Sequence, residues 1–233
     1  MVWQRRVDSD SDCKGLMRAA LNNLLVQRIW RFTGPEPRAR NDYATHIPVL
    51  IGLARLRAIT SVLEFGAGLY STKIFLNRKA FPDLKVLDSY ETDKNWRHVM
   101  SDVTDGDSRA TLHFVDGSMA TALEAINLEN YDLIFVDDSE SAAERVKTIK
   151  ALCARRPQSA LVVIHDYEVR EYIKGAQVFR YRFSFRAFNP ETGVVWERES
   201  RMRETLKQID RVVKRHAQQL EPDDVDGWLK AFE

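Results

Sequence analysis

The stretch Ser61-Val-Leu-Glu-Phe-Gly-Ala-Gly-Leu-Tyr-Ser-Thr72 begins with an apolar run and passes directly into closely spaced glycines. A short aliphatic run bounded by glycine predicts a buried strand that ends in a turn. Gly66 and Gly68 have no side chains, so the backbone can turn tightly there and approach a ligand closely. We therefore expect a strand, a ligand-binding turn and the start of a helix.

The whole chain has the composition of a globular protein. Its 233 residues suit one α/β domain with extra helices better than two full domains. Hydrophobic residues make up 44% and charged residues 30%, which argues against a disordered chain. Cys13 and Cys153 lie far apart, which argues against a disulfide framework or a thiolate metal site. No apolar run resembles a secretory signal or a membrane span, so we expect a cytoplasmic protein.

From Ser61 onward, short apolar runs alternate with longer helix-like segments, which is typical of successive βαβ units. The predicted strands cover residues 61–65, 86–91, 111–115, 131–137 and 160–165. The predicted helices between them cover residues 71–79, 93–101, 118–127, 139–154 and 167–174. The last two strands are almost continuously apolar, so we expect a parallel sheet with helices on both faces.

The N-terminal part of the chain follows a different pattern. We divide the chain into a polar arm with helices over 1–57, forming a lid or a partner contact, and a sheet domain over 58–233. Apolar spacing predicts a helix over 14–32. A second helix follows, with Thr45 or His46 as N-cap.

The C-terminal part predicts a hairpin and a helix. Residues 178–188 and 193–199 alternate aromatic or aliphatic residues with arginine, which predicts a β-hairpin. A final helix over 200–220 has one apolar stripe. The stripe consists of Met202, Leu206, Ile209, Val213 and Leu220.

Candidate ligand-binding residues follow each predicted strand, because ligands of open α/β sheets bind at the carboxyl ends of the strands. Glu64, just before the glycines, can accept a hydrogen bond from a ligand amino group, directly or through water. Glu91 ends the second strand, where a carboxylate can receive both hydroxyls of a ribose. Asp116 and Asp137 follow the third and fourth strands. Acids and serines at such places are also common helix caps, so the inference rests on their order and co-occurrence.

The segment Val62-Leu-Glu-Phe-Gly-Ala-Gly68 resembles motif I of the class I S-adenosylmethionine (SAM)-dependent methyltransferases. The similarity covers residues 61–166. It implies a doubly wound, mostly parallel seven-stranded sheet with a C-terminal antiparallel hairpin, helices on both faces, and SAM as cofactor. Tyr70 stands where the family has its third glycine, a departure from both this motif and the dinucleotide fingerprint. The cofactor-binding residues implied are Glu64, Gly66, Ala67, Gly68, Ser71, Glu91, Thr92, Asp116, Gly117, Ser118 and Asp137.

Two residues after the fifth predicted strand are the candidate catalytic residues. Methyl transfer to a hydroxyl needs a positioned acceptor and a group that removes its proton. His165 is at the same rim as the glycine turn, an imidazole in general titrates near neutrality, and Asp166 orients His165 or binds a ligand. A helix cap or a packed core position is the other interpretation of His165. His46 either lies over the pocket or caps a surface helix.

The segment Val163-Ile-His-Asp-Tyr167 is similar to the strand-five segment of some small-molecule and carbohydrate O-methyltransferases. Related enzymes place a divalent ion on acids that end strands four and five. The corresponding positions are Asp137 and Asp166, whose hard oxygen ligands suit Mg²⁺. Tyr167 stands where catechol-type enzymes have asparagine, so no further ligand is identified.

The predicted function is O-methylation of a small-molecule or sugar-like acceptor. The alternative is a non-catalytic methyltransferase-fold subunit that contacts a protein or RNA partner, and aminopropyl transfer is a further chemistry for the same fold. The formal net charge of +1, and acids interleaved with the arginines of the final helix, argue against nucleic acid or membrane binding. The apolar stripe of that helix covers the sheet or forms a homodimer contact through terminal helices.

Overall fold

The computed structural model describes residues 41–139, 141–198 and 201–233. Residues 1–40 of the expected segment 1–57, with the helix expected over 14–32, lie outside these residues. Residues 41–233 form one compact unit. Within the described ranges, no helix combines the length and the apolar character needed to cross a bilayer.

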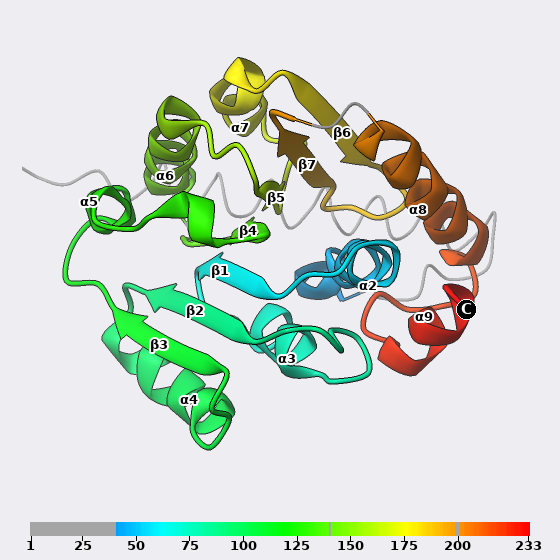
Figure 1. The fold of residues 1–233 in the computed structure, drawn as a ribbon, viewed down its shortest axis with the longest axis horizontal. Helices are drawn as coiled ribbons and strands as arrows, with labels where there is room; N and C mark the ends of the chain where they lie inside the picture. The colour runs from blue at the N-terminus through cyan, green and yellow to red at the C-terminus, as the bar shows by residue number, and fades with distance from the viewer. Residues whose placement is uncertain (1–40, 140, 199–200) are drawn as a thin grey trace, which may run out of the picture. The chain divides into compact units, whose positions relative to one another are not determined.

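Seven strands form one sheet in the order β3-β2-β1-β4-β5-β7-β6, which confirms the predicted fold class (Figure 1). The strands from β1 to β5 pair in parallel, and β7 pairs antiparallel with both β5 and β6. The chain runs from β1 outward to β3 and then returns to β4, so the order reverses between β1 and β4. Their bounds are β1 (Ser61–Phe65), β2 (Val86–Glu91), β3 (Ala110–Phe114), β4 (Leu133–Val136), β5 (Leu161–Ile164), β6 (Tyr181–Phe185) and β7 (Thr192–Trp196).

Helices cover both faces of the sheet, because successive side chains of each buried strand point to opposite faces. In β4, Leu133 and Phe135 join the core cluster on one face, whereas Ile134 and Val136 join the cluster on the other. The bounds are α2 (Ile47–Leu56), α3 (Ser71–Leu76), α4 (Lys94–Thr104), α5 (Met119–Glu124), α6 (Ala142–Arg155), α7 (Arg170–Gly175), α8 (Met202–His216) and α9 (Val225–Ala231). Short 3₁₀ turns, η1 (Asp42–Ala44), η2 (Leu128–Asn130) and η3 (Ala176–Val178), complete the set.

The apolar stripe of α8 covers the core of its own chain. Met202, Leu206, Ile209 and Val213 are all buried, and α8 packs against α2 and β6. α2, which falls in the expected segment 1–57, also packs against α9 and lies in the same core cluster. Of the two interpretations of the stripe, the structure supports the one in which it covers the domain.

Several element boundaries differ from the predictions for local reasons. α6 begins at Ala142 rather than 139, because the chain after β4 first forms a loop that carries Asp137 and Asp138. α4 begins after Asp93, whose side chain accepts hydrogen bonds from the amides of Asn95 and Trp96. α9 was not predicted, because a seven-residue helix is too short to show helical periodicity.

Candidate active site

A cavity of about 650 Å³ lies at the carboxyl ends of β1, β2 and β4, on both sides of the point where the strand order reverses. This is the place where open α/β sheets bind their ligands. The predicted cofactor-binding residues that line it are Gly66, Ala67, Gly68, Ser71, Glu91, Thr92 and Asp137. The other lining residues are Tyr43, His46, Leu69, Tyr70, Asp93, Trp96, Asp138, Ser139 and Arg145.

Gly66 is required at its position by two independent constraints. Its φ angle is +87°, which side chains disfavour, and a Cβ atom there would lie 2.2 Å from the carbonyl oxygen of Asp137. The turn after β1 therefore packs directly against the backbone after β4. Tyr70, at the position of the family's third glycine, adopts a right-handed helical conformation just before α3, so the helix still starts at Ser71.

Glu64 stabilises the glycine turn from beneath the cavity. It is fully buried, and its Oε2 accepts hydrogen bonds from the hydroxyls of Thr72 at 2.7 Å and Ser89 at 2.5 Å. The Thr72 hydroxyl in turn accepts from the amide of Gly68 at 3.1 Å. Burial raises the pKa of Glu64 to about 7. Its Oε1 has no hydrogen-bond partner among the described residues, and Glu64 is not among the lining residues.

Glu91 and Trp96 form the β2 side of the cavity. Glu91 Oε1 accepts hydrogen bonds from the amides of Thr92 and Asp93, each at 2.7 Å. Burial raises the pKa of Glu91 despite these hydrogen bonds. The indole of Trp96 donates to the carbonyl of Ala67 at 2.7 Å, which joins α4 to the glycine turn. No ligand-binding role for Trp96 was predicted from the sequence.

Besides Glu64, three predicted cofactor-binding residues do not line the cavity. Asp116 and Gly117 are exposed, and Ser118 precedes α5 without making a side-chain cap. None of the three is among the cavity-lining residues. Their expected contact with the cofactor therefore has no support from the cavity.

Arg145 lies between the two carboxylates that were expected to hold Mg²⁺. Its Nη2 is 2.7 Å from Asp137 Oδ1, and its Nη1 is 2.6 Å from Asp166 Oδ2. The Arg145 side chain is only 7% exposed, so the guanidinium supplies the positive charge at this place. The structure therefore does not support a Mg²⁺ site made of these two carboxylates.

His165 is buried behind the cavity, and neither of its ring nitrogens is free. Nδ1 lies 3.3 Å from Asp137 Oδ2 and 3.6 Å from Asp166 Oδ1, whereas Nε2 is 3.0 Å from the hydroxyl of Thr45. Burial alone would lower the pKa of His165, but the hydrogen bond and charge of Asp137 raise it. Burial likewise opposes ionisation of Asp137, and the neighbouring His165 and Arg145 lower its pKa nevertheless. His165 is thus placed to orient Asp137, and it is not among the lining residues.

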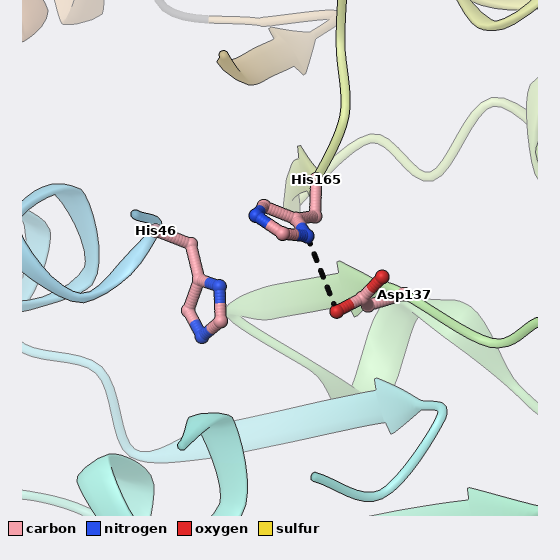
Figure 2. Close-up of side chains that lie close together, drawn as sticks. All are labelled: His46, Asp137 and His165. Atoms are coloured by element: carbon pink, nitrogen blue, oxygen red, sulfur yellow. Dashed lines mark ion pairs between the residues drawn. The ribbon is translucent and has the colours of Figure 1, made fainter. Parts of the chain in front are cut away.

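His46 lines the cavity. The other interpretation, in which His46 caps a helix at the surface, is wrong. It precedes α2 without a side-chain cap bond, and it is 1% exposed. Burial and the nearby His165 lower its pKa to about 3, so the imidazole is neutral. Neither ring nitrogen has a hydrogen-bond partner among the described residues. Figure 2 shows the ring beside His165 and Asp137, at the meeting point of α2, β4 and β5.

Arg145 is the main site residue that the sequence did not single out. It lies in the first turns of α6, where the positive end of the helix dipole disfavours a cation. Because this position is unfavourable for a cation, an arginine here, shortly after Asp137 and Asp138, predicts that nearby carboxylates compensate its positive charge. Nothing in the sequence pairs it with Asp166, which follows the next strand.

No protein-family model matches the sequence, and no curated protein sequence matches it. Solved structures do share its fold. Human methyltransferase-like protein 13 in complex with SAH is 16% identical, with a TM-score of 0.53 over 77% of this chain and 94% of that chain. SAH-bound Podospora anserina methyltransferase PaMTH1 is 14% identical, with a TM-score of 0.51 over 84% and 100%.

Spermidine synthase from Thermotoga maritima is similar to the same degree. It is 13% identical, with a TM-score of 0.51 over 82% of this chain and 72% of that chain. At sequence identities of 13% to 16%, the similarity shows a shared fold only. The chain therefore has the α/β fold that methyltransferases and spermidine synthase share, as the glycine-turn motif predicted.

Proposed function

We propose that this protein is a SAM-dependent methyltransferase that acts on an oxygen atom of a small-molecule or sugar-like acceptor. The cavity at the strand-order reversal carries the proposal, because the glycine turn, Glu91 and Asp137 meet there. Two of the similar structures have SAH bound, which supports an adenosyl ligand for this fold.

The lining residues fit SAM. The volume of about 650 Å³ lies in the range of small-ligand pockets, roughly 300–1,000 Å³. Gly66 and Gly68 leave bare backbone at the turn, and Glu91 offers a carboxylate suited to the two ribose hydroxyls. Asp137, whose pKa is lowered by His165 and Arg145, supplies negative charge beside a sulfonium. SAM brings an electrophilic methyl group, so the protein must mainly position the acceptor and receive its proton.

His46 is better placed than His165 to receive that proton. A hydroxyl acceptor needs an imidazole that faces it with a free nitrogen, and His46 lines the cavity and has no other partner among the described residues. The predicted base, His165, is held by Thr45 and Asp137. We therefore assign His165 a positioning role, and propose His46 as the residue that faces the acceptor.

Calorimetric titration with SAM tests the cofactor assignment. We expect binding by the wild-type protein and a loss of about 10-fold to 100-fold in affinity for Glu91→Gln, which removes a charged hydrogen-bond acceptor. Glu124→Gln, at an exposed position of α5, is the matched control and should bind as the wild type does. Absence of wild-type binding, or unchanged binding by Glu91→Gln, would contradict the proposal.

Aminopropyl transfer is the second candidate, and the similarity to spermidine synthase favours it. The two chemistries leave different products: methyl transfer leaves S-adenosylhomocysteine, whereas aminopropyl transfer leaves methylthioadenosine. The protein is incubated with a cell extract and either SAM or the aminopropyl donor. Chromatography of the nucleoside products then distinguishes methyl transfer from aminopropyl transfer. Cofactor binding without transfer to any extract component would instead favour the non-catalytic subunit with a protein or RNA partner.

A further inference from the structure

Three side chains from three different elements meet at the floor of the cavity and offer a set of possible metal-ligand atoms. His46, Asp137 and His165 each provide one nitrogen or oxygen atom, and these atoms lie within 4.8 Å of one another. They come from the start of α2 and from the loops after β4 and β5 (Figure 2). We propose that they bind a divalent first-row transition-metal ion such as Zn²⁺.

The separations are close to those of a coordination sphere. Two ligand atoms about 2.1 Å from a tetrahedral ion stand about 3.4 Å apart. His165 Nδ1 and Asp137 Oδ2 are 3.3 Å apart. All separations in the set are within 4.8 Å, so a shift of His46 by at most about 1.4 Å would complete the geometry.

His46 itself points to a ligand outside the chain. It is 1% exposed, yet neither Nδ1 nor Nε2 has a hydrogen-bond partner among the described residues. Buried polar groups nearly always have such a partner. The ring is held between Phe135, at 4.8 Å between centroids, and His165, at 4.9 Å. A metal ion would satisfy one of the two orphaned nitrogens.

The other two side chains are oriented from behind, as ligands of metal ions usually are. His165 Nε2 lies 3.0 Å from the Thr45 hydroxyl, which can accept its proton and leave Nδ1 as the ligand atom. Arg145 Nη2 holds Asp137 Oδ1 at 2.7 Å, which leaves Oδ2 for the ion. His165 and Asp137 thus each have one partner on the far side and one atom directed into the cluster.

The ligand types select a transition metal over Mg²⁺. Two imidazoles and one carboxylate suit Zn²⁺, Fe²⁺ or Ni²⁺, whereas Mg²⁺ takes oxygen ligands. Three protein ligands leave at least one position open, and His46 and Asp137 both line the cavity. A hydroxyl bound at that position would have a lowered pKa, which suits an oxygen acceptor. A bound ion would take the place of the free His46 imidazole as the group that activates the acceptor, so this inference deepens the proposed function. Metal binding itself is measured without cofactor and does not depend on methyl transfer.

The test uses the full chain without a polyhistidine tag, stripped by a chelator and then titrated with Co²⁺, whose visible spectrum reports its ligands. Zn²⁺ content is then measured by mass spectrometry after dialysis. We expect one Zn²⁺ per chain and at least a 100-fold loss of affinity in His46→Gln, since even residues behind the ligands change affinity by about 10-fold to 100-fold. His98→Gln, at an exposed position of α4, should bind as the wild type does.

X-ray absorption of the Zn²⁺-loaded wild-type protein counts the imidazole ligands directly, so the test does not depend on how a variant folds. Two imidazoles are expected. Less than one ion per chain in the wild type, equal affinity in His46→Gln, or fewer than two imidazoles would overturn the proposal. In the first case His46 acts as a metal-free base, and SAM binding would be unaffected.

Discussion

The two sides of the cavity are built in different ways. On the β1–β2 side, Glu91 accepts from the amides of the next two residues, and Glu64 accepts from Thr72 eight positions away. On the β4–β5 side, the Thr45 hydroxyl meets His165 across 120 positions of the chain. The first side is a local arrangement of one strand and its turn, whereas the second is assembled by the tertiary fold.

The two sides also differ in how many of their buried polar atoms have hydrogen-bond partners. The β1–β2 side holds its backbone with short hydrogen bonds and leaves one carboxylate oxygen, Glu64 Oε1, without a partner among the described residues. The β4–β5 side gathers two histidines, two aspartates and a buried arginine, and leaves both nitrogens of His46 without one. The unpartnered nitrogens of His46 therefore indicate more strongly than Glu64 Oε1 where a ligand or a reacting group binds.

The largest expected effect comes from the contact that joins the two sides. Gly66→Ala places a Cβ 2.2 Å from the Asp137 carbonyl, at a φ of +87°. We expect a loss of at least about 4 kcal/mol in the free energy of unfolding, measured by urea denaturation. Gly106→Ala is the matched control, since φ is +89° and no atom lies within 4 Å. It should lose only about 1–2 kcal/mol from the backbone conformation, and equal losses would contradict the steric explanation.

Removing the cation of the β4–β5 side should have the next largest effect. Arg145→Gln leaves Asp137 and Asp166 facing each other without a compensating charge, so we expect a loss of about 3–5 kcal/mol in the free energy of unfolding. Lys147→Gln on the same helix breaks an exposed ion pair with Glu144 and should cost less than about 1 kcal/mol. Similar losses in both variants would show that burial does not strengthen the Arg145 pairs.

Glu64 should make the β1–β2 side sensitive to pH. Burial raises its pKa from 4.5 to about 7, so the folded protein keeps a proton that the unfolded chain releases. Its contribution to stability is therefore fully present below pH 4.5 and is lost as the pH rises to about 7, by roughly 3 kcal/mol at most. Glu64→Gln should remove this slope from denaturation curves measured between pH 4.5 and 7.5. A parallel pH profile in the variant would contradict the assignment.

The smallest expected effect is at the hydroxyl that supports His165. Thr45→Val is close in shape but loses the contact with His165 Nε2, so we expect a loss of about 1 kcal/mol in stability. Thr111→Val, at an exposed position of β3, should change stability by less than about 0.5 kcal/mol. An unchanged Thr45→Val protein would show that the hydroxyl does not hold the imidazole.

The sequence predicted most of the β1–β2 side because its residues are neighbours in the chain. Strands β1 and β2 have the predicted bounds, and Gly66, Ser71 and Glu91 line the cavity as expected. Glu64 was expected to meet the ligand but supports the turn from beneath. The turn after β3, with Asp116, was expected at the ligand and is not among the lining residues, because motif order does not fix how far a loop reaches.

The sequence by itself determined the fold, because the fold follows from properties of contiguous residues. These properties are the periodicity of the strands and helices and the glycine that the turn after β1 requires. Only the tertiary structure decided what lies at the end of β4. It placed Arg145 between two carboxylates, held His165 behind the cavity wall through Thr45, and brought His46 from the start of α2 to the floor of the cavity. Such contacts depend on the packing of elements far apart in the chain, and no local pattern records the distance between them.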